Sequence, residues 1–398
     1  MKEITLNGSK SIVNRLLIIH ALCNHREDFS GVSNANDTLV LNRALDHRDE
    51  PIIDIEDAGT ACRFMTAFLA LYGENNVLVG SRRMSERPIE PLVSALNNLG
   101  ANISYVGKEG FLPLKFNNGY DKMSGGRVYL RADISSQFVS ALIMVAPFFK
   151  NGLEMILEGD VVSRPYIDMT LKIMEQFGIL FIANESVIKI PNQEYDLKPF
   201  IVEGDWSAAS YFYSLLCLSP HLKEIKINGL HKDSIQGDIE IHKIMEHFGV
   251  QTLFTPSGIV IKKITDFSFP SSFSYDFTSC PDLAQTCMVL VAALNIPSTF
   301  TGLTTLRNKE TDRLVAMKTE LESLGAKIDI SDSDFVLQKG IKKAKTAKGK
   351  IQTYKDHRIA MSFAPLMSTT PTLVIENPSV VSKSYPDFWR DFDSLNKQ

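Results

Sequence analysis

The stretch Val202-Glu203-Gly204-Asp205-Trp206-Ser207 decides the fold, because a short polar step there runs straight into an apolar run. Asp, Ser and Gly in such a place are typical of helix N-caps, and a β-like segment precedes them. The same arrangement occurs six times, at Gly8-Ser9-Lys10-Ser11, Asp57-Ala58-Gly59-Thr60, Asp133-Ile134-Ser135-Ser136, Asp205-Trp206-Ser207, Ser279-Cys280-Pro281-Asp282 and Asp356-His357-Arg358. The intervals are 49, 76, 72, 74 and 77 residues, which indicates one supersecondary unit used six times with a shortened first copy.

A second signal recurs with a similar period. A helical segment ends in an apolar residue and Gly, and a β-like run follows, at Leu99-Gly100-Ala101, Phe177-Gly178-Ile179, Phe248-Gly249-Val250 and Leu324-Gly325-Ala326. Gly after a helix is a common left-handed C-cap, placed where the chain must turn. Each unit is therefore predicted to contain a strand, the polar step, a helix, a strand, a second helix and further strands, which is an α/β (α+β) arrangement.

The length of 398 residues is too great for one ordinary hydrophobic core, so two domains of about 200 residues are expected. Three units make one such body, and the dividing point falls near residues 202–205. The sequence has no linker-like Pro/Ser tract, so the join is predicted to be a short hinge. The segments 136–144 and 282–294 are apolar on nearly all sides and are predicted to be buried helices.

Composition excludes several classes of function. The net charge of −4, from 42 basic and 46 acidic side chains, gives no general basic field for nucleic acid. The histidines and cysteines show no metal-ligand spacing, and the cysteines are expected to be reduced thiols. The sequence starts without a signal-peptide pattern, and its longest apolar run, near residues 139–149, is too short for a membrane span. A cytoplasmic protein without metal or other cofactor is expected.

Basic residues recur at or near the predicted helix starts, namely Lys10, Arg15, Arg87, Lys309, Arg313, His357, Arg358 and Lys383. Each alone is usually a solvated surface charge, but recurrence at equivalent positions of the repeat favours a function. A helix N-terminus carries unbonded N–H groups and about half a positive charge, so cations beside it make a site for anions. Ser9-Lys10-Ser11 is not a nucleotide-binding P-loop, because Ser9 stands where that motif needs Gly.

Two acidic residues stand beside these cations. Asp282 lies at a predicted helix start in an apolar neighbourhood, where an N-cap is the ordinary alternative. Glu310 lies between Lys309 and Arg313, where a surface ion pair is the ordinary alternative. If both face a basic cleft, one carboxylate can take a proton while the other gives one.

These motifs together closely resemble the 5-enolpyruvylshikimate-3-phosphate synthase family of enolpyruvyl transferases. The matching stretches keep the family order over nearly the whole chain: GSKSIVNR (8–15), DAGTACRF (57–64), RRMSERPIEPL (82–92), ISSQF (134–138), SRPYI (163–167), VEGDWSAASYF (202–212), SIQGD (234–238), PDLA (281–284), LRNKETDR (306–313), YKDHRIAM (354–361) and KSYPDF (383–388). The resemblance implies two similar domains, residues 9–203 and residues 1–8 plus 204–398, hinged around a central cleft. Each is then a pseudo-threefold set of β-α-β-α-β-β units.

The resemblance also implies a reaction and a set of site residues. The enolpyruvyl group of phosphoenolpyruvate moves to the 5-hydroxyl of shikimate-3-phosphate, and phosphate is released by addition and elimination through a tetrahedral intermediate. Asp282 matches the proton acceptor, Glu310 the usual donor to C3, and Lys10 is a further candidate for proton transfer. The positions matching shikimate-3-phosphate-binding residues are Lys10, Ser11, Arg15, Ser135, Ser136, Gln137, Ser163, Asp282 and Lys309. Those matching phosphoenolpyruvate-binding residues are Lys10, Gly59, Arg87, Gln137, Arg313, Arg358 and Lys383.

The chain departs from the common family pattern in several places. Its first interval lacks a β-hairpin-sized piece, which is expected to be trimmed away from the cleft. Asp57 stands where Asn is frequent, Phe64 where Pro is frequent, and Lys355 where Asn is usual. Thr305 falls where an Asn often contacts shikimate-3-phosphate. Glyphosate competes with phosphoenolpyruvate in sensitive members, and Gly59 followed by Thr60 is compatible with that sensitivity.

Two other functions remain as alternatives to the enolpyruvyl transfer to shikimate-3-phosphate. For that favoured function, a monomeric protein is expected. The sister enzyme, UDP-N-acetylglucosamine enolpyruvyl transferase, usually carries a reactive Cys near an Arg-Pro motif, whereas residues 81–88 contain no Cys. A non-catalytic binding protein on the same fold would be marked by loss of an acid or of a cleft Arg. Asp282, Glu310 and the matched cations are all present.

Overall fold

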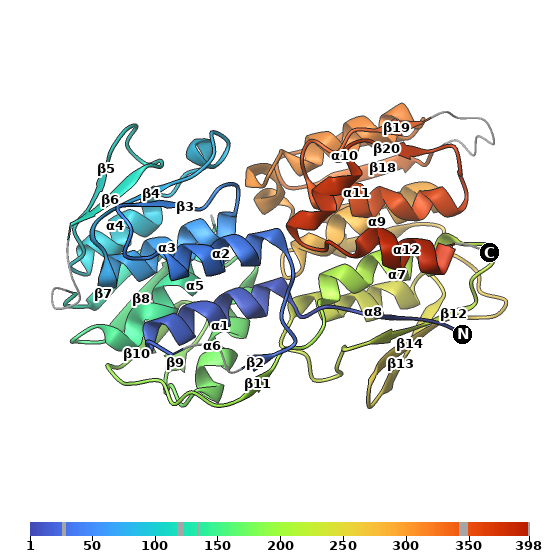
Figure 1. Ribbon diagram of the computed structural model, residues 1–398. Coiled ribbons are helices and arrows are strands. Elements are labelled where there is room, and N and C mark those ends of the chain that lie inside the picture. The colour runs from blue at the N-terminus through green and yellow to red at the C-terminus, as the bar shows by residue number, and fades with distance from the viewer. Residues whose placement is uncertain (26–28, 118–122, 134, 342–348, 397–398) are drawn as a thin grey trace. The chain divides into compact units, whose positions relative to one another are not determined.

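The computed structural model describes residues 1–25, 29–117, 123–133, 135–341 and 349–396. The chain forms two compact units (Figure 1). Unit 1 comprises Met1–Ser9 and Glu203–Gln398, and unit 2 comprises Lys10–Val202. The chain therefore passes from one unit to the other twice, at residues 9–10 and 202–203.

Unit 2 alternates helices and short strands. Its helices are α1 (Lys10–Leu22), α2 (Asn36–Asp46), α3 (Gly59–Tyr72), α4 (Glu90–Asn98), α5 (Ser136–Val145) and α6 (Arg164–Gln176), with the 3-10 turns η1 (Met84–Glu86) and η3 (Ala146–Phe148). Its strands are β2 (Phe29–Ser30), β3 (Ile52–Asp54), β4 (Glu74–Val79), β5 (Ile103–Tyr105), β6 (Leu114–Asn117), β7 (Gly126–Arg131), β8 (Leu153–Glu158), β9 (Ile182–Ala183), β10 (Val187–Ile190) and β11 (Phe200–Ile201). The sheet orders are β3-β4-β6-β5, β7-β8-β10-β9 and β11-β2.

Unit 1 has the same alternation. Its helices are α7 (Trp206–Leu218), α8 (Ile241–Glu246), α9 (Ala284–Leu294), α10 (Arg313–Ser323), α11 (His357–Phe363) and α12 (Phe388–Asn396), with the 3-10 turns η4 (Gly237–Glu240), η5 (Pro281–Leu283), η6 (Thr304–Asn308), η7 (Ala364–Ser368) and η8 (Pro378–Lys383). Its strands are β1 (Lys2–Thr5), β12 (Glu224–Asn228), β13 (Val250–Thr255), β14 (Gly258–Lys263), β15 (Phe273–Asp276), β16 (Ser298–Thr301), β17 (Lys327–Ile330), β18 (Phe335–Lys339), β19 (Lys350–Ile351) and β20 (Val374–Ile375). The sheet orders are β1-β12-β14-β13, β15-β16-β18-β17 and β19-β20.

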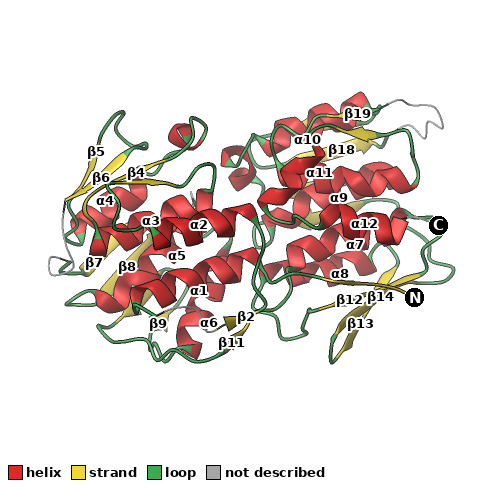
Figure 2. Ribbon diagram, in the orientation of Figure 1, coloured by secondary structure: helices red, strands yellow, loops and turns green. Residues whose placement is uncertain are grey.

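Each four-stranded sheet is one copy of the repeat. Its first two strands are parallel, as in β3 with β4 and β15 with β16, where one helix connects them. In the sheet that contains β1 and β12, all of unit 2 and α7 lie between these two strands along the chain. Its last two strands form an antiparallel hairpin that pairs with the second strand, as in β5 and β6 beside β4. Figure 2 shows the helices of each unit gathered beside these strands. The predicted α/β fold of β-α-β-α-β-β units is confirmed.

The core of each unit is made of the first helix of each copy. In unit 2, α1, α3 and α5 pack against one another, and in unit 1, α9 packs against both α7 and α11. Every residue of α5 except Gln137 is buried, and α9 is buried from Ala284 to Ala292. The predicted burial of these two helices is confirmed, because a helix that is apolar all round is stable only inside a core.

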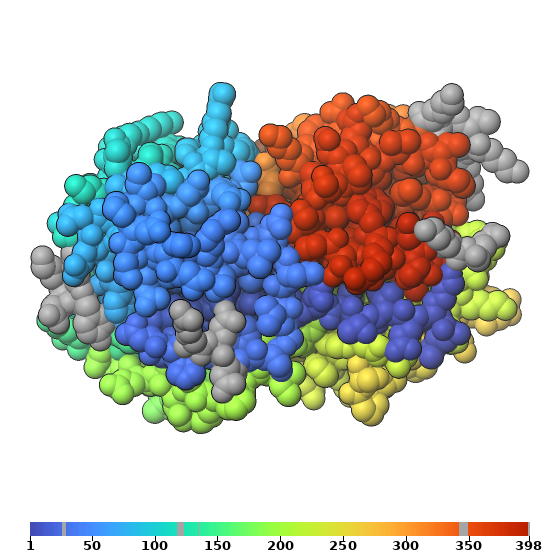
Figure 3. Space-filling model, viewed as in Figure 1, coloured from blue at the N-terminus to red at the C-terminus, as the bar shows by residue number. Residues whose placement is uncertain are grey.

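In each unit, one parallel pair joins strands that lie far apart in the sequence. β1, from the N-terminus, pairs in parallel with β12 of unit 1, and β11, near residue 200, pairs in parallel with β2 of unit 2. Gly8 and Gly204 form an isolated antiparallel bridge where the chain passes between units. In Figure 3 the dark blue N-terminal residues lie between the red C-terminal helix and the yellow strands of the same unit.

The shortened first copy has a simple structural cause. In the copies that contain α4, α6, α8 and α10, the second helix is followed by a hairpin. α2 ends at Asp46 and the next described element is β3, which begins at Ile52, so no hairpin lies between them. The predicted loss of a β-hairpin-sized piece is confirmed, whereas its position relative to a cleft stays a prediction.

Local signals at helix ends give a mixed outcome. The four glycines that follow helices have positive φ, at Gly100 (106°), Gly178 (81°), Gly249 (72°) and Gly325 (94°), as predicted. Side-chain caps are present at Ser135, Asp205 and Asp356. The cap expected at Asp57 is wrong: α3 begins after Ala58 without a side-chain cap, and the Asp57 carboxylate instead accepts a hydrogen bond from the Ser81 hydroxyl.

Three further observations concern whole classes of site. None of the helices in the described ranges has the length and apolarity needed to cross a membrane. No group of three or more His, Cys, Asp or Glu residues in those ranges is placed to hold a metal ion. The five cysteines are free, and Cys62, Cys280 and Cys287 are buried.

Candidate active site

An ionic cluster in unit 1 is centred on Arg313, the first residue of α10. Its guanidinium donates to three carboxylates, at 2.7 Å to Asp356 Oδ2, 3.1 Å to Asp282 Oδ1 and 2.9 Å to Glu310 Oε2. The Arg313 side chain is only 2% exposed. Burial lowers the pKa of Arg313, but the three carboxylates outweigh burial and hold this pKa above its usual range. The cluster therefore keeps a permanent buried cation.

Asp282 joins this cation to a second arginine. Arg358 Nη2 lies 3.0 Å from Asp282 Oδ2, so the two oxygens of one carboxylate face two guanidinium groups. The N-cap alternative for Asp282 is wrong, because neither η5 nor α9 receives a side-chain cap. The carboxylate is 14% exposed, which leaves part of it open to a ligand.

Asp356 fixes both arginines, although no site role is predicted for it from the sequence. It is fully buried, accepts from Arg313, and caps α11 by accepting from the Arg358 backbone N–H at 2.9 Å. The signal was present in the sixth polar step, where Asp stands directly before His357 and Arg358. An Asp that caps a helix and binds an arginine of another helix orients both elements together.

Lys309 and Glu310 lie between η6 and α10. The Glu310 side chain is 17% exposed and its partner Arg313 is 2% exposed, so the surface ion-pair alternative is wrong and the pair is largely buried. Lys309 is half-buried, and burial lowers its pKa while the Asp282 carboxylate opposes that shift. Lys383 is not at a helix start but ends η8, a turn that packs against α11.

Three residues without a predicted site role lie near Arg358, two in contact with it and one behind them. Its Nη1 lies 3.3 Å from the Tyr211 hydroxyl and its Nη2 lies 3.4 Å from Ser207 Oγ. The Ser207 hydroxyl also donates to the buried Asp238 carboxylate. Burial raises the pKa of Asp238 to about 7, and the negative charge of Asp282 adds to the effect. All three fall in stretches that carry the family resemblance, 202–212 and 234–238, which was the available signal.

In unit 2, a polar group of predicted residues lies at the start of α5. Ser135 caps the helix, its Oγ accepting from the Gln137 N–H at 3.3 Å. The Gln137 side chain donates to Thr60 Oγ1 of α3 at 3.1 Å. Ser136 is buried in the first turn. Ile134, which belongs to the matching stretch, lies outside the described residues.

The structure also brings Gly59 and Arg87 together. Gly59 is the first residue of α3, and a Cβ there would lie 2.6 Å from Arg87 Nη1. The guanidinium therefore lies against the start of the helix, in a place that only a residue without a side chain leaves open. Two residues predicted for phosphoenolpyruvate thus meet in unit 2.

Arg15 is held by the protein's own neutral groups. It is 2% exposed, and its guanidinium donates to Thr170 Oγ1 at 2.6 Å, Ser140 Oγ at 3.2 Å, and the carbonyls of Ser11 and Tyr166 at 2.7 and 3.1 Å. Burial lowers the pKa of Arg15 to about 10. The guanidinium carbon lies 5.5 Å from the centre of the Phe64 ring, so the Phe that replaces a frequent Pro packs against this cation. A role for Arg15 and Ser11 in ligand binding stays a prediction.

Lys10 opens α1 and forms an ion pair with Asp37 of α2, at 3.0 Å between Nζ and Oδ2. The two side chains are 15% and 7% exposed. Asp37 was not predicted from the sequence, because it lies in the shortened copy away from any matching stretch. Ser163 precedes α6 with φ of +56°, a left-handed backbone that is uncommon outside Gly and is often found at functional sites.

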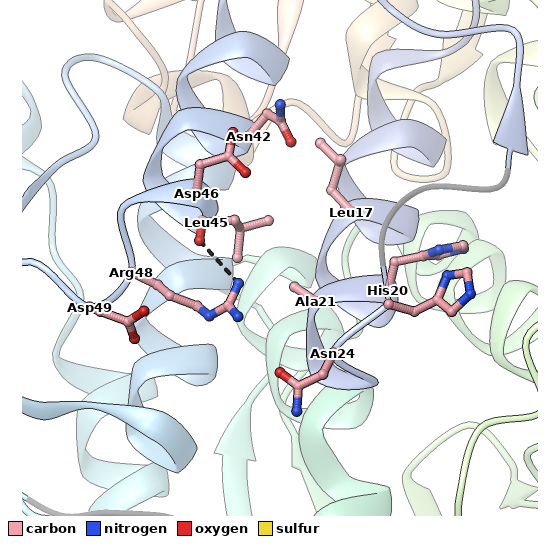
Figure 4. A pocket seen from close by; sticks show the side chains of 10 residues that line it. Leu17, His20, Ala21, Asn24, Asn42, Leu45, Asp46, Arg48 and Asp49 are labelled. Carbon is pink, nitrogen blue, oxygen red and sulfur yellow. Dashed lines mark hydrogen bonds between the residues drawn. The ribbon is translucent and has the colours of Figure 1, made fainter.

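A cavity of about 350 Å³ lies elsewhere in unit 2, between the ends of α1 and α2 (Figure 4). Its lining residues are Leu17, His20, Ala21, Asn24, His25, Asn42, Leu45, Asp46, Arg48 and Asp49. None of them was predicted for substrate binding. The cavity lies at the end of the shortened copy, where α2 continues to β3 without a hairpin.

Thr305 stands at the position where the family often has Asn, and it lies in η6 of unit 1. Its buried hydroxyl makes no hydrogen bond with the described residues.

The fold, the ionic cluster of unit 1 and the polar group of unit 2 define an α/β protein of repeated units. Its helix starts and arginines suit anionic ligands. The family model of EPSP synthase (3-phosphoshikimate 1-carboxyvinyltransferase) matches residues 42–392. The chain belongs to this family of enolpyruvyl transferases, and the family predicted from the sequence is confirmed.

Similarity to individual proteins extends over nearly the whole chain. A 3-phosphoshikimate 1-carboxyvinyltransferase of Bacteroides fragilis (strain YCH46) is 44% identical over 390 residues, covering 98% of this chain and 93% of that protein. One of Buchnera aphidicola subsp. Cinara cedri (strain Cc) is 34% identical over 423 residues, covering 99% and 94%. A solved EPSP synthase of Acinetobacter baumannii has a TM-score of 0.75 and 19% identity, covering 99% of this chain and 95% of that chain, which supports the fold.

Proposed function

We propose that this protein transfers the enolpyruvyl group of phosphoenolpyruvate to the 5-hydroxyl of shikimate-3-phosphate and releases phosphate, by addition and elimination through a tetrahedral intermediate. The observation that carries the proposal is the contact of Asp282 with both Arg313 and Arg358. It joins two anion-binding groups to a group that can accept a proton. The names of the full-length relatives support the same reaction.

The proposal assigns the cations to the anionic groups of the substrates, since each substrate carries a carboxylate and a phosphate. Arginine forks bind such groups bidentately, and lysines supply point charges. Phosphoenolpyruvate is assigned to Lys10, Gly59, Arg87, Gln137, Arg313, Arg358 and Lys383. Shikimate-3-phosphate is assigned to Lys10, Ser11, Arg15, Ser135, Ser136, Gln137, Ser163, Asp282 and Lys309.

Proton transfer is assigned to the carboxylates and to one lysine. Asp282 accepts the proton of the 5-hydroxyl, and Glu310 gives a proton to C3 of phosphoenolpyruvate. When a substrate anion binds one of the two arginines, the Asp282 carboxylate loses a stabilising partner. Asp282 then becomes a better base. Lys10, held by Asp37, is a further candidate. A preorganised cation beside the departing phosphate contributes about 3 kcal/mol to such a transition state.

Further properties belong to the same proposal. Residues 9–203, and residues 1–8 plus 204–398, act as the two enolpyruvyl-transferase-like domains, and the protein works as a monomer in the cytoplasm. Glyphosate competes with phosphoenolpyruvate, and the close approach of Gly59 to Arg87 supports this assignment.

The test is phosphate release by the purified protein with phosphoenolpyruvate and shikimate-3-phosphate, with UDP-N-acetylglucosamine as the alternative acceptor. Phosphate that appears only with shikimate-3-phosphate is the expected result. Release with the sugar nucleotide would assign the protein to the sister activity. No release with either acceptor, from a folded sample, would favour a binding protein on the same fold.

A further inference from the structure

Helix α10 holds the segment before α11 at two points. Arg313, at its start, binds Asp356. Glu320 lies seven residues later, which places it two turns along the same face of the helix. Its carboxylate oxygens accept from the backbone N–H of Gln352 at 3.0 Å and from the Tyr354 hydroxyl at 2.6 Å. Glu320 is 3% exposed, and both ends of the segment 352–356 are attached to one helix, by partly buried hydrogen bonds at Glu320 and by a buried ion pair at Asp356.

The segment between these two points has a strained backbone. Tyr354 has φ of +51° and Lys355 has φ of +56°, two consecutive left-handed residues that are not Gly. The Asp356 N–H donates to the Thr353 carbonyl at 2.7 Å, which closes a turn around them. A turn with positive φ at both central positions strongly favours Gly and Asn, so Tyr and Lys persist there only where other contacts hold the chain.

We propose that Glu320 is a positioning residue for the transfer reaction. Glu320 holds the left-handed Tyr354–Lys355 turn through its hydrogen bond with the Tyr354 hydroxyl. The turn presents Asp356 to Arg313 and to the first turn of α11. Through Asp356, Glu320 fixes the orientation of Arg313 and of the backbone that carries Arg358. The inference rests on the proposed function, which assigns both arginines to phosphoenolpyruvate.

The test variant is Tyr354→Phe, which keeps the ring and removes only the bond to Glu320. Loss of a hydrogen bond to a charged group predicts a rise of about ten-fold in KM for phosphoenolpyruvate, with KM for shikimate-3-phosphate within about two-fold of wild type. Glu320→Gln should shift KM in the same direction. The matched controls are Tyr213→Phe, whose hydroxyl bonds Thr252 at 2.7 Å in the same unit, and Glu322→Gln on the same helix. Neither control should change KM.

A rescue experiment separates positioning from a general loss of stability. Asn adopts the left-handed conformation more readily than Lys, so Lys355→Asn added to Tyr354→Phe should return KM for phosphoenolpyruvate to within about three-fold of wild type. An unchanged KM in Tyr354→Phe, equal changes for both substrates, or no rescue by Lys355→Asn would each overturn the inference. A wild-type protein that releases no phosphate overturns the proposed function itself, and this outcome is distinct from an active wild type with an equally active Tyr354→Phe variant.

Discussion

The candidate residues of the two units stand in different electrostatic surroundings, although both units repeat the same architecture. In unit 1, Arg313 is held by three carboxylates, and one of them, Asp282, also holds a second arginine. In unit 2, Arg15 is held by hydroxyls and carbonyls, and Gln137 and Ser135 at the start of α5 are neutral, whereas Lys10 forms an ion pair with Asp37.

This difference has a chemical meaning. A carboxylate beside arginines is a group whose basicity a bound anion can change, so unit 1 is equipped for proton transfer. We expect the neutral donors at the start of α5 to orient an anionic ligand without offering it a proton acceptor, while Lys10 with Asp37 is the candidate of unit 2 for proton transfer. On the proposed function, the side chains at the helix starts of one repeated backbone give the two units different shares of the chemistry.

The largest effect should follow from removing the base in unit 1. Asp282→Ala is expected to lower kcat by about a thousand-fold while shikimate-3-phosphate still binds, because a positioned general base contributes about that factor. Steady-state phosphate release and equilibrium binding measure the two effects. Asp329→Ala, at an exposed position of β17, is the control. A nearly normal kcat in Asp282→Ala would reduce Asp282 to a structural partner of the arginines.

The second effect tests whether Arg15 in unit 2 is a structural cation. Arg15→Ala leaves the buried Thr170 and Ser140 hydroxyls without this donor and should lower the free energy of unfolding by about 3 kcal/mol. Thermal or urea unfolding gives the measurement. Arg127→Ala, an exposed arginine of the same unit, should leave the unfolding transition in place. If Arg15→Ala unfolds like wild type, the contrast between the two units loses its main support.

The third effect concerns Gly59 in unit 2. The added Cβ in Gly59→Ala would push the Arg87 guanidinium away, and because that group is the far end of a flexible side chain, the fold should persist. Inhibition by glyphosate should weaken by about ten-fold, with a smaller rise in KM for phosphoenolpyruvate. Gly107→Ala is a matched control, since a Cβ there meets only Pro113 at 3.8 Å. Equal losses for glyphosate and substrate would rule out this discrimination.

The smallest effect should be a change in the pH dependence of stability in unit 1. Burial raises the pKa of Asp238 to about 7, from about 4 in an unfolded chain. Between these values the folded state binds more protons than the unfolded state, so stability falls as pH rises from about 4 to about 7. Asp238→Asn removes this titrating group. Between pH 5 and pH 7.5 the melting temperature of wild type should therefore fall by a few degrees more than the melting temperature of Asp238→Asn.

The control for this measurement is Asp233→Asn, at an exposed position in the same segment. Parallel melting profiles for wild type and Asp238→Asn would show that Asp238 gains no proton on folding. The Asp238 carboxylate would then carry a negative charge in the folded protein, close to the charge of Asp282.

The features that were predictable from the sequence are those with a local cause. The burial of α5 and α9 follows from helices that are apolar on all sides, and the positive φ of Gly100 follows from the need to leave a helix. The missing hairpin of the first copy follows from one short interval in an otherwise regular repeat. Membership of the family follows from motifs whose order and number are far more specific than any one of them.

The features that were not predictable depend on contacts between distant parts of the chain. The N-cap alternative for Asp282 failed because Arg313 and Arg358, far along the sequence, bind its carboxylate. Asp37 has no local mark of its partnership with Lys10, since only the packing of α2 beside α1 brings them together. The burial of Arg15 depends on hydroxyls of α5 and α6, so its amino-acid type predicted charge but not surroundings.

The pairing of β1 with β12 has a consequence for synthesis on the ribosome. Because β1 precedes unit 2 in the chain, it must wait unpaired until all of unit 2 and α7 have been made, whereas unit 2 has its own residues in one continuous stretch. The Lys2 ammonium donates to the Leu395 carbonyl at 2.7 Å, so the two ends of unit 1 are neighbours. A circular permutant that opens between Ser9 and Lys10 and joins the old termini would make each unit contiguous, and would let both fold in the order in which they are translated.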